Sequence, residues 1–283
     1  MFRSKNLLVF ILVGFLALTL TLAGCSNNQT PAPNGDSDQP AEKKVVKIGA
    51  SAVPHAEILE FIKPKLAEQG IDLQIQVFND YVLPNLATDN GDLDLNFFQH
   101  IPYLDSFNAE RNLNLVTVTK VHIEPMGIYS KKVTAVSDLA EGGTIAIPND
   151  PSNSGRALIL LEAAGVIKLK EGTDILATVD DIAKNPKNFE IKMVDAAQLP
   201  RVLDDAKVTG AVINTNYALE ANLDPTQDAL HIEGKDSPYP NVLVAKAERA
   251  EEPVLKQVAD ELNSEEVRNF IIDKYKGAIV PAF

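Results

Sequence analysis

Apolar and polar residues from Val45 onward follow the spacing of alternating strands and helices. Short apolar or alternating runs predict strands, and apolar residues three or four positions apart predict helices. A further helix is expected to begin near Ile101 or Pro102, because proline fits the first turn of a helix. The first block of predicted elements comprises strands at 45–51, 73–78 and 93–97, helices at 55–69 and 81–88, and a long extended stretch at 115–129.

The same rhythm starts again in the second half of the chain. This second block comprises strands at 144–147, 190–194 and 210–213 with helices at 155–164 and 199–206, then a strand at 242–245 and amphipathic helices at 253–262 and 264–275. Alternation of strands and helices predicts an α/β fold with largely parallel sheets.

Extended segments around 122–129 and 231–233 join the two blocks, so we expect two lobes that the chain crosses between twice. Lobe 1 is predicted at 45–125 and 235–283, and lobe 2 at 126–234. In open α/β sheets, ligands bind beyond the carboxyl ends of the strands. The turns that meet this description are 99–103, 148–156 and 214–217.

The N-terminal residues have the pattern of a secretory signal. Arg3 and Lys5 precede an apolar run at 7–22, which is shorter than the roughly 20 residues of a membrane span. Leu22-Ala23-Gly24-Cys25 resembles the site at which bacterial lipoprotein precursors are cleaved. We therefore expect a signal peptide at 1–24, a lipid on Cys25, and an extracytoplasmic protein held at the cell membrane.

Residues 26–44 contain no aromatic and no large aliphatic side chain, which predicts a flexible tether at 25–44. The formal net charge of −13 argues against binding to nucleic acid and against docking to membranes through basic residues. Cys25 is the only cysteine, so an internal disulfide and a second cysteine nucleophile are both excluded.

Catalytic motifs are missing from the chain. There is no GxSxG, HExxH, CxxC or GxxxxGK[ST], so we expect no enzyme and no cofactor. The four histidines are far apart in sequence, and none forms a pair with metal-ligand spacing. A metal site that combines His55, His100 and His122 with carboxylates remains an alternative.

The segment 147–156 (IPNDPSNSGR) is the most informative one. A predicted strand enters a loop rich in Asn, Asp and Ser, and a helix follows with Arg156 near its start. Helix N-termini bind anions, and a guanidinium adds a planar fork that matches a carboxylate. Arg156 is thus a candidate carboxylate clamp, and the alternative is a surface arginine paired with a local acid.

Other polar and aromatic residues lie at the same strand ends. Asn214 and Asn241 offer amides that both donate and accept, although asparagine is also common in turns. Tyr81, Phe98 and Tyr103 form either an aromatic box or part of the core. Alternation along the strand places Phe98 and His100 on one face and assigns Phe97 to the core on the other.

Five motifs resemble the methionine-binding lipoproteins of ABC importers, the NlpA/MetQ family. They are Phe78–Asn85 (FNDYVLPN), Asn96–Leu104 (NFFQHIPYL), Ile147–Leu158 (IPNDPSNSGRAL), Ala211–Tyr217 (AVINTNY) and Ser237–Asn241 (SPYPN), which together span the body of the chain. The resemblance implies a two-lobed periplasmic-binding-protein fold (type II-like) with two crossover strands and an amino acid enclosed between the lobes.

The resemblance also implies roles for individual residues. The carboxylate-binding arginine of the family matches Arg156, its paired asparagines match Asn214 and Asn241, and Asn153 lies in the matching loop. Asn216 departs from the threonine that the family often has there. The contacts to the ligand side chain match Tyr81, Phe98, His100 and Tyr103.

A protein of this kind captures zwitterionic methionine and delivers it to an ABC importer permease with its cytoplasmic ATPase, and we expect it to be a monomer. The alternatives are a receptor for a methionine-containing dipeptide or for D-methionine, and a metal-ion receptor.

Overall fold

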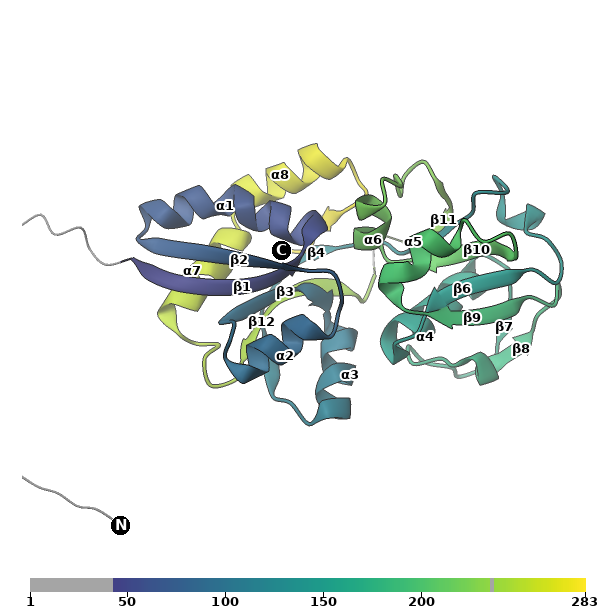
Figure 1. The fold of residues 1–283 in the computed structure, drawn as a ribbon, viewed down its shortest axis with the longest axis horizontal. Helices are drawn as coiled ribbons and strands as arrows, with labels where there is room; N and C mark the ends of the chain where they lie inside the picture. Colours follow the sequence, from purple (N-terminus) through teal and green to yellow (C-terminus); the bar gives the residue numbers. More distant parts are fainter. Residues whose placement is uncertain (1–42, 235–236) are drawn as a thin grey trace, which may run out of the picture. The chain divides into compact units, whose positions relative to one another are not determined.

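The computed structural model describes residues 43–234 and 237–283, which form an α/β body of two lobes (Figure 1). The predicted signal peptide, Cys25 with its predicted lipid, and most of the predicted tether lie outside these residues, so those assignments stay predictions. Within the described ranges, none of the helices is long and apolar enough to cross a membrane.

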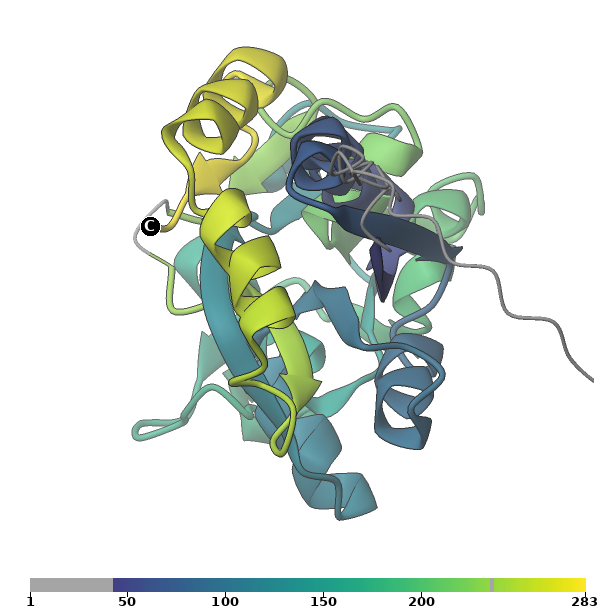
Figure 2. The ribbon, with the colours of Figure 1, turned by 90° about the vertical axis from the view of Figure 1, so that its left-hand side faces the viewer.

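The first lobe is built on a sheet of six strands in the order β13-β4-β12-β3-β1-β2. Its strands are β1 (Lys44–Ser51), β2 (Ile71–Phe78), β3 (Leu95–His100), β4 (Leu115–Ile123), β12 (Pro240–Lys246) and β13 (Val280–Pro281). Its helices are α1 (Glu57–Glu68), α2 (Leu83–Asn90), α3 (Ile101–Arg111), α7 (Pro253–Leu262) and α8 (Glu265–Tyr275). α7, yellow-green in Figure 2, lies over the strands of this sheet.

The alternation of side chains along β12 explains how helices cover both faces of this sheet. Leu243 and Ala245 pack into a core with residues of α1, α7 and α8. Val242 and Val244 point to the other face and contact Leu104 of α3. A strand buried on both sides has no polar face, as the sequence of β12 shows.

The second lobe is built on a sheet of five strands in the order β11-β5-β10-β6-β9. Its strands are β5 (Gly127–Tyr129), β6 (Thr144–Pro148), β9 (Glu190–Val194), β10 (Val208–Ile213) and β11 (Ala229–Ile232). Its helices are α4 (Pro151–Ala163), α5 (Leu199–Val202) and α6 (Thr215–Glu220), and a small hairpin pairs β7 (Lys168–Leu169) with β8 (Ile182–Lys184). Helix α4 packs on one face of the sheet, and α5 and α6 pack on the other.

The chain passes between the sheets twice in the described residues. It leaves β4 through residues 124–126 to enter β5, and it leaves β11 after Ile232 to return to β12. This confirms the predicted fold class with two crossings. The division into lobes at 125/126 and 234/235 stays a prediction.

The prediction of largely parallel sheets is wrong for the strands next to the crossings. β2, β1 and β3 are parallel, as are β10, β6 and β9. β12 pairs antiparallel with both β3 and β4, and β5 pairs antiparallel with both β10 and β11. β5 and β12 are the first strands that the chain forms after each crossing. Each therefore enters its sheet from the side of the other lobe and runs antiparallel to its neighbours.

Two helix predictions also need correction. α4 begins at Pro151 rather than 155, because Asp150 caps it by accepting from the Asn153 backbone N–H and proline occupies the first turn. α5 ends at Val202 rather than 206. The turn predicted at 214–217 is the start of α6, with Asn214 at its N-cap position.

Candidate ligand-binding site

One pocket contains every ligand-contact residue named from the sequence. The space between its atoms, including space that is open to solvent, is about 320 Å³. Gln99, Glu124, Thr215 and Asn216 also line it, and sequence reasoning did not identify these four. The lining residues named from the sequence are Tyr81, Phe98, His100, Tyr103, Asn153, Arg156, Asn214 and Asn241.

Three aromatic side chains of the first lobe form what we call the aromatic wall: Tyr81, Phe98 and Tyr103. Their ring centroids are 5.9 Å (Tyr81–Phe98), 5.7 Å (Tyr81–Tyr103) and 6.0 Å (Phe98–Tyr103) apart, which is within the usual range for aromatic pairs. The Tyr103 hydroxyl donates to the backbone oxygen of Tyr81 at 2.8 Å. Phe97 lies on the other side of β3 in the main core, as its position in the alternation predicts.

The rest of the pocket is the polar wall: Glu124, Asn153, Arg156, Asn214 and Asn241. Asn153 is the residue that orders it. The Asn153 Nδ2 donates to both carboxylate oxygens of Asp150 at 3.0 Å, so its Oδ1 faces the opposite way. That oxygen accepts from Asn214 Nδ2 at 2.7 Å and from His100 Nε2 at 3.1 Å.

This chain of hydrogen bonds fixes the orientation of the pocket groups. Because Asn214 donates through Nδ2, its Oδ1 is left as a buried acceptor without a partner among the described residues. His100 carries its proton on Nε2, since its Nδ1 accepts from the Tyr103 backbone N–H at 3.1 Å. Burial, together with the nearby Arg156 charge, lowers the pKa of His100 to about 3, so the ring is neutral at pH 7.

Asn241 is oriented from the first lobe in the same way. His55 Nε2 lies 3.1 Å from Asn241 Oδ1 and 3.3 Å from a Glu124 oxygen. Both are acceptors, so His55 donates from Nε2, and its Nδ1 accepts from the Ser51 hydroxyl at 2.6 Å. With its oxygen held by His55, Asn241 retains Nδ2 as the donor for the pocket.

Arg156 is neither exposed nor free. Its side chain is 3% exposed, and its Nε and Nη2 donate to the Glu233 carboxylate at 3.0 and 2.5 Å. Nη2 also donates to the backbone oxygen of Glu124 at 2.7 Å, and the guanidinium lies 4.2 Å from the centroid of the Tyr239 ring. The alternative of a surface arginine is therefore wrong, because the side chain is buried, although Arg156 does pair with an acid, Glu233. Its Nε and Nη2 are used in these hydrogen bonds, which leaves Nη1 for a ligand.

Gly155, next to Arg156, allows α4 to pack closely against a neighbouring loop. A Cβ at this position would collide with the backbone oxygen of Ile175 and would lie 2.9 Å from the Ala177 backbone nitrogen. The loop before Ala177 thus packs directly on α4, which only glycine permits.

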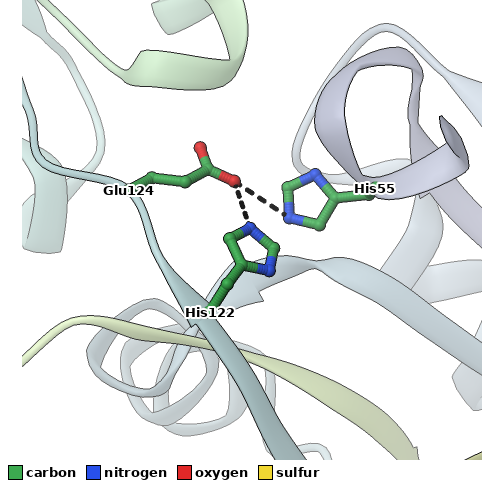
Figure 3. A group of neighbouring side chains, drawn as sticks. All are labelled: His55, His122 and Glu124. Carbon is green, nitrogen blue, oxygen red and sulfur yellow. Dashed lines mark hydrogen bonds and ion pairs between the residues drawn. The ribbon is translucent and has the colours of Figure 1, made fainter. Parts of the chain in front are cut away.

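Two of the histidines considered for a metal meet in the structure. His55, His122 and Glu124 place one ligand atom each within 4.8 Å of one another, and all three are buried (Figure 3). His100 lies apart from them, against Asn153 and Tyr239. Hydrogen bonds among the three residues and to Ser51 and Asn241 already account for both nitrogens of His55 and for His122 Nε2.

The residues missed from the sequence share one feature, which is that they are polar but buried. Gln99 exchanges hydrogen bonds with Asn85 at 2.9 and 2.6 Å and contacts Asn96 at 2.8 Å. Asn216 accepts from the Tyr81 hydroxyl at 2.5 Å and thereby links the aromatic wall to the second lobe. The sequence signal that could have indicated Gln99 is a group of polar residues, Asn96, Gln99 and His100, in and directly after a predicted strand.

Comparison with known proteins agrees with these motifs. Residues 46–283 match the family model described as NlpA lipoprotein. The chain is 40% identical to the D-methionine-binding lipoprotein MetQ of Salmonella typhi over 96% of both chains. It is 43% identical to the membrane lipoprotein TpN32 of Treponema pallidum, over 84% of this chain and 89% of that one.

A solved structure gives the same result. A nutrient binding protein from Burkholderia cenocepacia, determined bound to methionine, superposes with a TM-score of 0.81 at 47% identity, covering 84% of this chain and 100% of that one. The family model, which matches residues 46–283, covers both sheets and all five motifs. This chain belongs to the NlpA lipoprotein family.

Proposed function

We propose that this protein is the substrate-binding component of an ABC importer and that it encloses methionine in the pocket described above. The observation that carries the proposal is the division of one small pocket into a polar wall and an aromatic wall. An amino acid with an apolar side chain has the same division. The match to a family of substrate-binding lipoproteins supports a binding role for this pocket.

Arg156 Nη1 and Asn241 Nδ2 would donate to the α-carboxylate, and Asn214 Oδ1 would accept from the α-amino group. The thioether would lie against Tyr81, Phe98 and Tyr103. Burial of such a side chain contributes roughly 1.5–3 kcal/mol, and sulfur–aromatic contact adds about 0.3–1.5 kcal/mol. Relatives described as D-methionine-binding and a neighbour solved with methionine support this ligand class.

The lipid on Cys25 would hold the protein at the outer side of the cell membrane, near the permease that takes up the ligand. Because both lobes supply pocket residues, release of the ligand requires the lobes to separate. We expect the permease to recognise the closed form, and we expect the receptor itself to be a monomer.

The proposal is tested on protein that has been unfolded and refolded to remove bound ligand. Thermal unfolding is measured with L-methionine, D-methionine, glycyl-methionine and norleucine. A ligand at 100 times its dissociation constant adds about 2.7 kcal/mol to the free energy of unfolding. A raised melting temperature with methionine is expected, and no shift with any of the four ligands contradicts the proposal.

A further inference from the structure

Arg156, Glu233 and Glu124 meet at the polar wall, and in the described residues Glu124 forms no ion pair with a lysine or an arginine. Arg156 donates twice to the carboxylate of Glu233, at 3.0 and 2.5 Å, so Glu233 neutralises it. Glu124 is the second carboxylate there, and its side chain is 6% exposed. Burial raises the pKa of Glu124, so its ionised form is costly at this place unless a cation lies beside it.

Neutral donors surround the Glu124 carboxylate. One oxygen accepts from His122 Nε2 at 2.7 Å and faces His55 Nε2 at 3.3 Å (Figure 3). The other accepts from the Asn216 backbone N–H at 3.1 Å. Burial lowers the pKa of His55 to about 4 and that of His122 to about 3, so neither ring is a cation at pH 7. Uncharged donors orient the carboxylate, but they leave its charge unmatched.

The position of Glu124 defines where a matching cation would lie. Glu124 lines the pocket, and its own backbone oxygen accepts from Arg156 Nη2 at 2.7 Å. In an α-amino acid, the ammonium and carboxylate are attached to the same carbon. A ligand whose carboxylate is bound by Arg156 would therefore carry its ammonium group in the same pocket that Glu124 and the unpartnered Asn214 Oδ1 line.

We propose that Glu124 is the counter-charge for the α-ammonium group of the ligand, so that the pocket selects free amino acids over ligands without an ammonium next to the carboxylate. This inference rests on the proposed function and adds a specificity rule to it. In glycyl-methionine, the nitrogen next to the carboxylate is an uncharged amide. Glu124 therefore disfavours that dipeptide, whereas it is compatible with either enantiomer of methionine.

The first test uses the wild-type protein, refolded free of ligand, and isothermal titration calorimetry. The ligands are methionine, its desamino analogue and its α-hydroxy analogue. The hydroxyl can still hydrogen-bond to Asn214 but has no charge. Both analogues should bind at least about 100-fold more weakly than methionine, since hydrogen bonds between charged groups are the strong ones. Binding of the hydroxy analogue within tenfold of methionine overturns the role of charge at Glu124.

The second test uses Glu124→Gln, which keeps the shape of the side chain and removes its charge. Methionine should lose about 100-fold in affinity, while the desamino analogue should change by less than about threefold. The matched control is Glu261→Gln, because Glu261 is also a buried glutamate but pairs with Lys65 at 2.9 Å in the first lobe. The control should keep the wild-type ratio of the two affinities.

The outcomes separate this inference from the proposed function. Equal loss of both ligands in Glu124→Gln indicates a purely structural role and overturns the inference alone. Failure of the wild-type protein to bind methionine overturns both. If the variant does not fold, the ligand series on the wild-type protein still decides.

Discussion

The two walls of the pocket are built in different ways. The aromatic wall comes from the first lobe alone, between residues 81 and 103, and its rings touch one another at centroid distances of 5.7–6.0 Å. The polar wall joins the crossing, the start of α4 and the starts of α6 and β12, and each side chain in it is oriented by a partner from elsewhere in the fold. The first wall offers apolar area, whereas the second offers fixed donors and acceptors.

This difference determines how each wall should discriminate among ligands. Apolar area changes little when one methylene replaces another group of similar size. A fixed donor or acceptor that loses its partner remains buried and unpaired, which costs more. The polar wall should therefore decide which class of ligand binds, and the aromatic wall should cause only small differences in affinity among ligands of that class.

The largest expected effect comes from Arg156→Gln, which removes the cation of the polar wall. Removal of one partner of a buried charge pair costs about 3–5 kcal/mol, or at least about 100-fold in binding. Calorimetry should therefore show loss of methionine binding, and decarboxylated methionine should fail to bind the wild-type protein. The matched control is Arg249→Gln, since Arg249 also binds a carboxylate, Glu252, through two nitrogens but lies outside the pocket. Retention of affinity within tenfold in Arg156→Gln would show that the clamp lies elsewhere.

Acidification should weaken the fold through the histidines that orient the polar wall. Burial keeps the pKa of His55 at about 4 and that of His100 at about 3, below the ordinary 6.5. The unfolded chain therefore takes up protons below pH 6.5 that the folded chain excludes. Stability is complete above pH 6.5 and falls as the pH drops from there toward 4, by about 1.4 kcal/mol per pH unit for each histidine.

Urea unfolding at pH 7 and pH 5 measures this effect. His100→Gln should reduce the loss of stability between the two pH values. Glutamine does not titrate, so the unfolded variant takes up one proton fewer than the unfolded wild-type chain. His231→Gln is the control, since His231 lies half buried on β11 outside the pocket. Equal stability of the wild-type protein at both pH values would contradict the assignment of neutral rings.

Asn153→Ala tests whether orientation within the polar wall matters as much as its charge. Without Asn153, the amide of Asn214 and the ring of His100 both lose the acceptor that fixes them. We expect methionine to bind about 10- to 100-fold more weakly, from a cost of about 1–3 kcal/mol. Asn263→Ala is the control, because Asn263 also donates from its side-chain amide, to Thr119 at 2.6 Å, in a partly buried place outside the pocket. If Asn153→Ala binds methionine as tightly as the control does, the side chain of Asn153 does not orient the groups that bind the ligand.

The smallest effect should come from the aromatic wall. Norleucine replaces the sulfur of methionine with a methylene and keeps the head group, so only the sulfur–aromatic contact of about 0.3–1.5 kcal/mol is lost. Norleucine should bind about two- to tenfold more weakly than methionine in the same calorimetric series. A difference above 100-fold would move the main source of specificity to the aromatic wall and reverse the comparison.

The aromatic wall also shows how far the sequence predicts a site. Alternation along β3 placed Phe97 in the core and Phe98 in the pocket, and the start of α3 placed Tyr103 one turn beyond His100. These relations hold within one short segment, so local geometry is sufficient to predict them. Local reasoning also named Arg156, Asn214 and Asn241 as candidates at strand ends, but only the resemblance to a family connected them to one another.

What the sequence determined by itself is the order of strands and helices, the two crossings and the candidates at strand ends. Only the tertiary structure decided that Glu233 neutralises Arg156, that Asp150 orients Asn153, and that Glu124 faces the pocket. The reason is physical. Hydrophobic periodicity is repeated along the chain and can be counted, whereas a buried polar group depends on partners many residues away. Those partners come within hydrogen-bonding distance only when both sheets have formed.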